Sequence, residues 1–337
     1  MFYFRQIWFV IVFFVLILVS LGLFLNYFVI PKSFIIDNQI VTVPENSTAG
    51  DIAHLLEETG IIKSSYAFKL YLKLFKLDKD CRSGTFMLGS HMSLGKIGHI
   101  LSTQSGDYYY TKVTIPEGFS IVQIVDLLAD KNIVEYDSFL SYVAHEAKDE
   151  FILDYEFLQA YSYDTLEGYL FPDTYYFKEN DNYRDIVNVM LNEFYKQIVI
   201  PYEASILKSK YTLHELSVLS SMIEKESRRH SEMKTISSVF YNRLNKGMKL
   251  ASDPTVVYSL GQSYKDRVYY KDLKVDSPYN TYKYKGLPPT PISSFGTLAF
   301  EASLYPIKSP YLFFVAVDNG YHHFSQTYAE HLSVQNK

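Results

Sequence analysis

The pattern of hydrophobic and polar positions begins with a long apolar run, which is followed by segments of helical and strand-like spacing. The run from Ile7 to Ile30 contains no charged residue. A helix of about 24 residues spans about 36 Å, enough to cross a bilayer core of about 30 Å. A cleaved signal peptide would have a shorter apolar run and a cleavage site of small residues, and no such site follows. The pattern therefore predicts a single-pass transmembrane helix at 7–30, preceded by a cytoplasmic tail at 1–6.

A repeat follows this run. The segment VTVPENSTAGDIAHLLEETGII at Val41–Ile62 matches VTIPEGFSIVQIVDLLADKNIV at Val113–Val134, 72 residues later. In each copy a short β-branched segment ends at a Pro-Glu pair, whose acids are Glu45 and Glu117. Apolar residues then recur at i, i+3 and i+4, which predicts an amphipathic helix in each copy.

The residues after the first copy complete a small unit. Their pattern predicts a strand at Thr85–Leu88 and a helix from Ser93 to about Leu101. We therefore expect a subdomain with the order β-α-α-β-α at 38–106. A second repeat-like unit and a connector would occupy 107–160.

The C-terminal half has a mixed pattern. Helical periodicity is found at Tyr183–Ile200, Glu215–Glu226 and Ser231–Lys246, and short strands and loops follow Gly247. Helices and short strands without βαβ alternation are typical of the α+β class. The sequence therefore predicts a mixed α+β domain at 161–337.

Composition narrows the functional classes. The net charge of -5 and the pI of about 6.0 argue against nucleic-acid binding through phosphates. The 31 tyrosines would suit stacking on sugar rings, but tyrosine is also common in cores and interfaces. Cys81 is the one cysteine, so no disulfide framework is possible. Adjacent His322 and His323 would point to opposite faces of a strand, so we expect no metal and no cofactor.

One helix carries candidate chemistry. In the predicted helix Leu213–His230, Glu224 lies beside the apolar stripe, in line with two serines, rather than opposite it. Desolvation would raise the pKa of such a carboxyl, as a general acid requires near neutral pH. An ordinary i,i+4 pair with Arg228 is the alternative, and Glu226 is a rival for the same role. Periodicity alone leaves these alternatives open.

Longer blocks add a family resemblance. The segment from Ser220 to Gly261, which contains SSMIEKES, is similar to the signature of the endolytic murein transglycosylase (MltG, YceG-like) family. LEGYLFPDTY from Leu166, SPYNTYKYKGLPPTPIS from Ser277 and SPYLFFVAVDNGYHHFSQTYAEH from Ser309 resemble further blocks of that family in the same order. The first repeat copy, together with SGTFML, looks like the LysM-like subdomain of a membrane-anchored cell-wall enzyme. Such modules bind N-acetylglucosamine-containing glycans, and the alternative is that the unit is a spacer.

The resemblance implies a lytic transglycosylase, a carbon–oxygen lyase that cuts peptidoglycan between N-acetylmuramic acid (MurNAc) and N-acetylglucosamine (GlcNAc). The family's catalytic glutamate is the first acid of EKE, which is Glu224 here. It would protonate the leaving oxygen and then act as base on the C6 hydroxyl, leaving a 1,6-anhydro end. Glu226 would then be a structural carboxylate with a buried partner.

Five other polar residues of these blocks are candidates for substrate binding. Each also has a structural reading, as a cap, a turn or part of an ordered loop. Gly168 next to the first of them would permit close approach of a sugar. The five candidates are Glu167, Asp253, Tyr279, Asn280 and Tyr282.

The resemblance also sets expectations for location and partners. We expect a single-pass protein of the inner (plasma) membrane, with its C-terminal domain periplasmic or extracytoplasmic. Peptidoglycan strands and the cell-wall synthases of elongation or division are the expected partners. Two alternatives remain: a non-catalytic peptidoglycan-binding scaffold, and a muramidase that would need a second carboxylate near Glu224.

Overall fold

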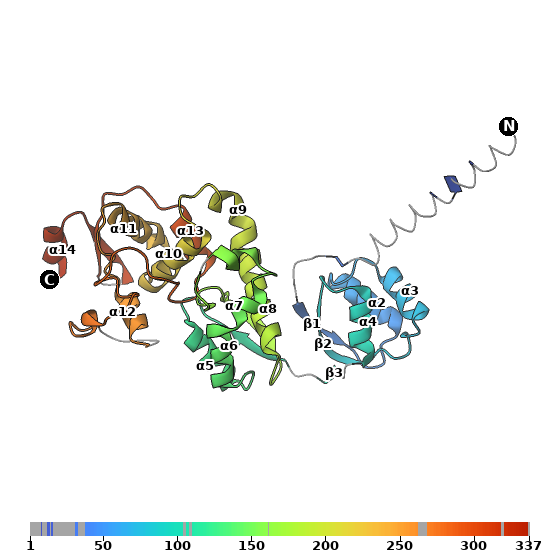
Figure 1. The fold of residues 1–337 in the computed structure, drawn as a ribbon. Coiled ribbons are helices and arrows are strands. Elements are labelled where there is room, and N and C mark those ends of the chain that lie inside the picture. Colours follow the sequence, from blue (N-terminus) through green and yellow to red (C-terminus); the bar gives the residue numbers. More distant parts are fainter. Residues whose placement is uncertain are drawn as a thin grey trace. The chain divides into compact units, whose positions relative to one another are not determined.

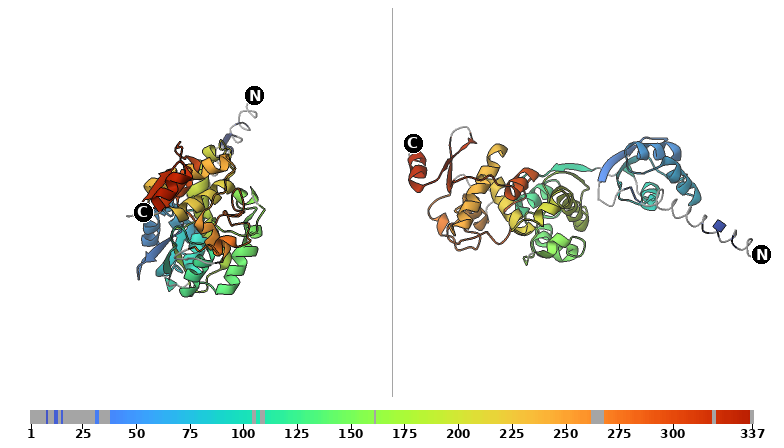
Figure 2. Two further views of the ribbon diagram at one scale, coloured as in Figure 1. Left: turned by 90° about the vertical axis from the view of Figure 1, so that its left-hand side faces the viewer. Right: turned by 90° about the horizontal axis from the view of Figure 1, so that it is seen from above.

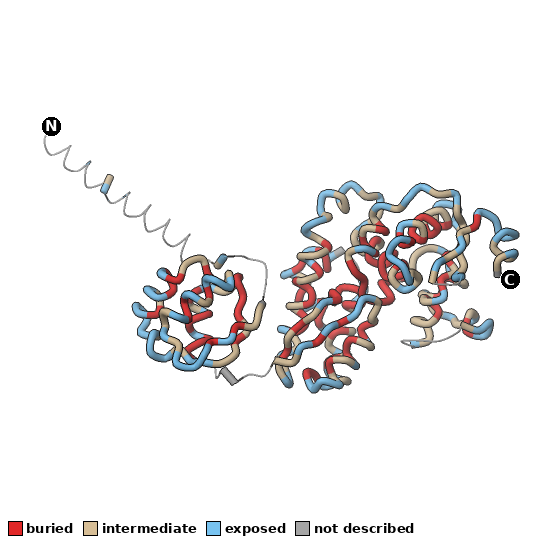
Figure 3. Tube along the Cα trace, turned by 180° about the vertical axis from the view of Figure 1, so that it is seen from behind, coloured by how far each residue is buried: buried red, intermediate tan, exposed pale blue. Residues whose placement is uncertain are grey.

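The computed structural model describes residues 38–103, 106–107, 110–160, 162–261, 268–317 and 320–335, with a few isolated residues before 38 (Figure 1). The chain divides into two compact units, Met1–Tyr110 and Thr111–Lys337. Each unit has its own cluster of buried hydrophobic residues (Figure 3). The expected transmembrane helix at 7–30 lies largely outside the described residues, and within the described part of the chain no helix is long and apolar enough to span a bilayer.

The smaller unit has the predicted order β-α-α-β-α, followed by a short third strand that was not predicted. Its strands pair as β1-β2-β3, antiparallel between β1 and β2 and parallel between β2 and β3. The apolar faces of three helices complete a core that includes Val41, Phe68 and Phe86. The elements are β1 (Asn38–Val43), α2 (Ala49–Glu58), α3 (Ser65–Leu74), β2 (Gly84–Gly89), α4 (Leu94–Thr103) and β3 (Gly106–Asp107).

The two repeat copies fold alike. Helix α2 begins with a capping box between Thr48 and Asp51, and α5 (Ile121–Asp130) begins with one between Ser120 and Gln123. A capping box satisfies backbone N–H groups at the helix start that would otherwise lack partners. The shared pattern of strand, Pro-Glu turn, capping box and ten-residue helix confirms that the repeat is structural.

The second copy, however, is closed by a strand from the C-terminal half. Strand β4 (Thr111–Thr114) pairs antiparallel with β5 (Thr174–Phe177), and the hydroxyls of Thr114 and Thr174 lie 2.9 Å apart. The expected boundary near residue 160 is therefore not where the structure divides the chain. The second copy and the C-terminal half share one core, because a two-stranded sheet needs the helices on its face to bury its apolar side.

The remaining elements surround the central helix α10 (Leu213–Glu226). This helix packs against α11, α12 and α13, and every residue from Leu216 to Ile223 is buried. Helix α14 packs on the hairpin of β6 and β7 at one end of the unit, drawn in red in Figure 2. The other bounds are α6 (Tyr136–His145), α7 (Ala147–Phe151), α8 (Tyr183–Phe194), α9 (Ile200–Ile206), α11 (Met233–Asn245), α12 (Asp253–Ser259), α13 (Thr297–Leu304), β6 (Phe313–Ala316), β7 (His322–Ser325) and α14 (Tyr328–Gln335).

Two helices differ from the sequence expectation. The helix predicted at Tyr183–Ile200 runs as α8, a π-helical turn at Tyr195–Val199 and then α9, which contains Pro201 in its first turn. The helix predicted to reach His230 ends at Glu226, because Ser227 adopts an extended conformation and its hydroxyl donates to the carbonyl of Arg229.

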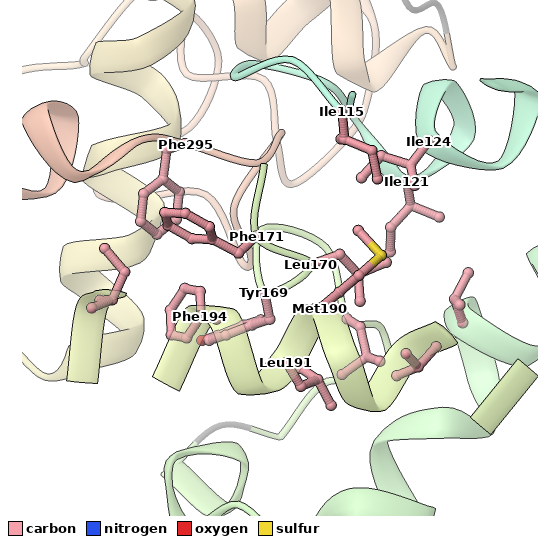
Figure 4. Packing of buried hydrophobic residues seen from close by; sticks show 14 of the residues in the cluster. Ile115, Ile121, Ile124, Tyr169, Leu170, Phe171, Met190, Leu191, Phe194 and Phe295 are labelled. Carbon is pink, nitrogen blue, oxygen red and sulfur yellow. The ribbon is translucent and has the colours of Figure 1, made fainter. Parts of the chain in front are cut away.

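The core brings distant segments together around one loop. In Figure 4 the side chains of Tyr169, Leu170 and Phe171 lie above α8, from which Met190 and Phe194 point toward them. The ring of Phe295 packs edge-on against Phe194, with centroids 5.9 Å apart (Figure 4). The contact between Phe194 and Phe295 fixes the loop from 291 to 296 against α8.

Candidate functional site

Glu224 lies in the last turn of α10, at the edge of the core. It is partly buried, and the backbone N–H of Gly296 donates to its Oε2 at 3.0 Å. Burial raises the pKa of Glu224, the hydrogen bond from Gly296 opposes this, and the nearby charge of Glu117 raises the pKa further. The helix ends at Glu226, so Arg228 does not lie one helical turn after Glu224. The alternative of an i,i+4 pair between these two residues therefore does not apply.

Two serines of α10 let the surrounding segments approach this helix closely. Ser221 accepts a hydrogen bond from the N–H of Ile292 at 3.0 Å, and Ser220 donates to the hydroxyl of Ser303 at 3.0 Å. Both serines are fully buried, and small side chains at these positions leave room for the loop before α13. The sequence therefore places Gly296 against Glu224 through packing around the serines.

A turn of the second repeat copy forms the other side of the site. The N–H of Gly118 donates to the carbonyl of Ser294 at 3.1 Å, and the N–H of Ser294 donates to Phe119 at 2.7 Å. Lys225 Nζ donates to the carbonyl of Gly118 at 3.0 Å. This turn carries Glu117, which sequence reasoning did not select as a site residue. The available signal was its position in the repeated Pro-Glu pair.

Glu226 belongs to a separate polar cluster. Its Oε1 accepts a hydrogen bond from the hydroxyl of Ser252 at 2.6 Å. Burial raises the pKa of Glu226 to about 7; the bond from Ser252 and the charge of Arg243 oppose this, and the charge of Asp253 adds to it. Glu226 therefore has a buried hydrogen-bond partner, Ser252.

Glu167 is buried, with 3% of its surface exposed, and its carboxylate caps the start of α5. Both of its oxygens accept from the N–H of Ile121, at 3.1 and 3.2 Å, and the hydroxyl of Tyr258 donates at 3.2 Å. The structure therefore assigns its hydrogen bonds to the fold and leaves little surface for substrate. Neighbouring Gly168 is not open to a sugar either, because Pro291 fills the space beside it.

This buried carboxyl predicts a pH dependence of stability. Burial raises the pKa of Glu167 from 4.5 to about 8, against the hydrogen bonds from Ile121 and Tyr258. The folded protein then holds this proton more tightly than the unfolded chain, so the free energy of unfolding falls as pH rises from about 4.5 to about 8. We expect a fall of about 2 kcal/mol, since the hydrogen bonds from Ile121 and Tyr258 favour the ionised form. Urea denaturation from pH 5 to 8 should show a flatter profile for Glu167→Gln, and equal slopes in both proteins would contradict this.

Asp253 and Tyr282 lie together beside Glu226. Asp253 is the first residue of α12 and is exposed, and the hydroxyl of Tyr282 donates to its Oδ1 at 2.6 Å. Burial, together with the hydrogen bond to Asp253, raises the pKa of Tyr282. Asp253 is the candidate whose carboxylate remains accessible.

Tyr279 and Asn280 order the loop that contains them. The hydroxyls of Tyr279 and Thr290 lie 2.8 Å apart, and the ring of Tyr279 packs on Tyr258. Asn280 is fully buried, and its amide donates to the carbonyls of Leu273 and Val275 at 3.0 and 2.9 Å. Its Oδ1 accepts from the N–H of Tyr282, so the side chain is committed to the loop.

Asn280→Ala should therefore act on stability. The change would leave two carbonyls and one N–H without their partner, and we expect a loss of about 2 kcal/mol in the free energy of unfolding. Urea denaturation measures this loss, with Lys283→Ala, an exposed neighbour, as the control. Unchanged stability together with a raised KM would instead return Asn280 to substrate binding.

No group of three or more His, Cys, Asp and Glu side chains among the described residues could hold a metal ion. His322 pairs with the carboxylate of Glu232. Its Nδ1 lies 2.9 Å from Glu232 Oε2, and its backbone N–H donates to the same carboxylate. This pair joins β7 to the turn before α11.

Comparison with known proteins identifies the family of this chain. Residues 41–337 match the model of the YceG-like family. An endolytic murein transglycosylase of Bacillus subtilis is 37% identical over 308 residues, covering 88% of this chain and 84% of the relative. A protein of the same name from Streptococcus pneumoniae strain D39 is 32% identical, and the alignment covers 82% of this chain but 54% of that relative.

A solved structure supports the fold. The crystal structure of a YceG-like protein, lmo1499, from Listeria monocytogenes is similar with a TM-score of 0.62 and 36% identity. The similarity covers 89% of this chain and 99% of that one. The chain belongs to the YceG-like family.

Proposed function

We propose that this chain is an endolytic peptidoglycan lytic transglycosylase, in which Glu224 acts first as general acid and then as general base. One observation carries the proposal: a carboxyl at the edge of a buried helix is held by the N–H of Gly296 at 3.0 Å, and burial raises its pKa. A carboxyl that stays protonated toward neutral pH can donate to a glycosidic oxygen. Relatives that share 37% and 32% identity carry the name endolytic murein transglycosylase.

The proposed reaction has two proton transfers through one residue. Glu224 gives its proton to the oxygen that leaves with GlcNAc, and the bond from this oxygen to C1 of MurNAc breaks. The ionised Glu224 then removes the proton of the C6 hydroxyl of the same MurNAc, and the C6 oxygen bonds to C1. Water takes no part, and the carboxyl ends in the form in which it began.

The hydrogen bond from Gly296 supports both roles. It fixes Oε2 of Glu224 and so orients the carboxyl toward one direction of proton transfer. An N–H donor also stabilises the ionised form that the second step requires, while burial favours the protonated form of the first. These opposing influences suit a group that must gain and lose a proton in each turnover.

A two-carboxylate muramidase is the second candidate, and the position of Glu117 favours it. Hydrolytic glycosidases use a pair of carboxyl groups, and Glu117 is the acid whose charge reaches Glu224 most strongly. Glu167 and Asp253 are engaged elsewhere by Ile121 and Tyr282. A muramidase would leave reducing ends, whereas the lytic reaction leaves anhydro ends.

The remaining parts of the proposal concern the setting of the reaction. The unit at 38–106 would act as a LysM-like module that contacts glycan, and the helix at 7–30 would anchor the chain in the plasma membrane. The catalytic unit would then lie outside the cytoplasm, beside nascent strands and the synthases of elongation or division. A non-catalytic scaffold would share this setting without needing the acid at Glu224.

The length of the products tests whether the enzyme cuts inside glycan strands, as an endolytic enzyme does. The full chain in detergent is incubated with long, uncrosslinked glycan strands, and the products are sized at early times. We expect strands of intermediate length to accumulate first, and cleavage by Glu224→Gln to be slower by about 10²-fold or more. Release of disaccharides from the beginning would contradict internal cutting, and bound but intact strands would favour the scaffold.

A further inference from the structure

Two equivalent acids of the repeat have different surroundings. Glu45 and Glu117 both follow a strand and a proline, and both are exposed. The residue after each has a positive φ, 63° at Asn46 and 79° at Gly118, so the two turns have a similar backbone. The turn at Glu117, unlike the turn at Glu45, is hydrogen-bonded to the loop of Ser294 and Gly296, which binds Glu224.

Gly118 and Gly296 bring the two acids together. A Cβ atom added at Gly118 would lie 3.8 Å from Cγ of Glu224, so the turn lies next to that side chain. A Cβ atom added at Gly296 would lie 1.7 Å from Oε1 of Glu117. The carboxyl of Glu117 therefore occupies the space where a side chain at 296 would stand. The backbone N–H of the same Gly296 holds Glu224.

Three hydrogen bonds hold the turn that carries Glu117. Gly118 and Ser294 are joined through their backbones, Ser294 is bonded to Phe119, and Lys225 donates to the carbonyl of Gly118. An exposed acid on a turn without such bonds would be less well ordered. Because these bonds already order the backbone of the turn, holding the carboxyl of Glu117 beside Glu224 costs only the conformational entropy of its own side chain.

We propose that Glu117 is a positioning residue of the active site, whose carboxylate beside Gly296 keeps Glu224 in the protonated form that the first step needs. This inference rests on the proposed function, because it concerns the same acid. It gives the second repeat copy a role in the reaction in addition to its place in the core.

Electrostatics supports this role. Two like charges at close range disfavour the ionised form of each other. Glu224 faces three charged or titratable groups: Glu117 from the turn, Lys225 from its own helix, and His230 after it. Burial and Glu117 raise the pKa of Glu224, while His230 and Lys225 lower it. Loss of the Glu117 charge would leave the two opposing groups in place.

The pH dependence of kcat/KM tests the proposal, with the full chain in detergent and uncrosslinked glycan strands as substrate. Activity that needs protonated Glu224 is lost as pH rises through the pKa of this group. For Glu117→Gln we expect the midpoint of this alkaline limb to move to lower pH by about half a unit or more. Activity well below the midpoint should remain within about threefold of wild type.

Two further variants sharpen the test. Gly296→Ala keeps the N–H that holds Glu224, and its methyl group displaces the flexible end of Glu117, so its midpoint should move in the same direction. Glu45→Gln makes the matching change in the other repeat copy and should leave the midpoint unchanged. An unmoved midpoint in Glu117→Gln, with activity lowered equally at every pH, would mean a merely structural role and overturn the inference.

The outcomes separate this inference from the function on which it rests. Wild-type protein that makes anhydro ends, with an unshifted midpoint in Glu117→Gln, refutes the role of Glu117 alone. Wild-type protein that makes reducing ends, with complete loss in Glu117→Gln, makes Glu117 the second acid of a muramidase and overturns both proposals. Inactive wild-type protein overturns both as well.

Discussion

Glu224→Gln should lower the rate of glycan cleavage by about 10²- to 10⁴-fold while glycan binding is retained. The amide has the shape of the carboxyl and can still accept from the N–H of Gly296, which donates to Glu224 at 3.0 Å. It cannot give a proton to the leaving oxygen or take one from the C6 hydroxyl. Single-turnover cleavage rates measure the loss, and co-sedimentation with peptidoglycan measures binding.

Glu226→Gln is the matched control for this variant. It lies two residues further along the same helix and accepts from Ser252 at 2.6 Å, so an amide can keep its hydrogen bond. We expect cleavage rates within about tenfold of wild type. The assignment of the acid would be wrong if Glu226→Gln lost activity and Glu224→Gln kept it.

Gly168→Ala should lower the free energy of unfolding more than the corresponding change at Gly286. Gly168 has φ of 85°, and an added Cβ atom would lie 2.3 Å from Cβ of Pro291. Strain at positive φ costs about 1–3 kcal/mol, and overpacking a rigid ring against backbone costs about as much again. We expect a loss of about 3–5 kcal/mol in the free energy of unfolding, measured by urea denaturation.

Gly286→Ala separates these two contributions. Gly286 has φ of 92°, and no atom lies within 4 Å of an added Cβ atom. The loss of stability in Gly286→Ala should therefore be the strain alone, about 1–3 kcal/mol. Equal losses in the two variants would show that the contact with Pro291 does not contribute.

Local patterns in the sequence predicted much of the fold. The repeat predicted two similar units because a Pro-Glu turn followed by a capping box specifies a helix start wherever it occurs. The apolar stripe of α10 predicted the edge position of Glu224, because helical spacing alone sets which residues share a face. The lytic chemistry assigned to Glu224 came from the family resemblance and is still a proposal.

Local patterns could not predict which segments far apart in the sequence pair with each other. The strand that closes the second copy, β5, begins at Thr174, and nothing in the spacing indicates its partner. The same limit applies to Glu117, which reaches Glu224 only because Gly118 and Ser294 bond across the molecule. Glu167 and Asn280 were selected as polar residues in matched blocks, and the structure turns both toward backbone groups.

The chemical form of the new glycan ends decides whether Glu224 carries out the lytic reaction. Peptidoglycan treated with the full chain, and with its Glu224→Gln variant, would be digested to small fragments and analysed by mass spectrometry. We expect 1,6-anhydro-MurNAc ends from the wild type and at least about 100-fold fewer from the variant in the same time. Reducing MurNAc ends from the wild type would contradict this expectation and identify a hydrolase.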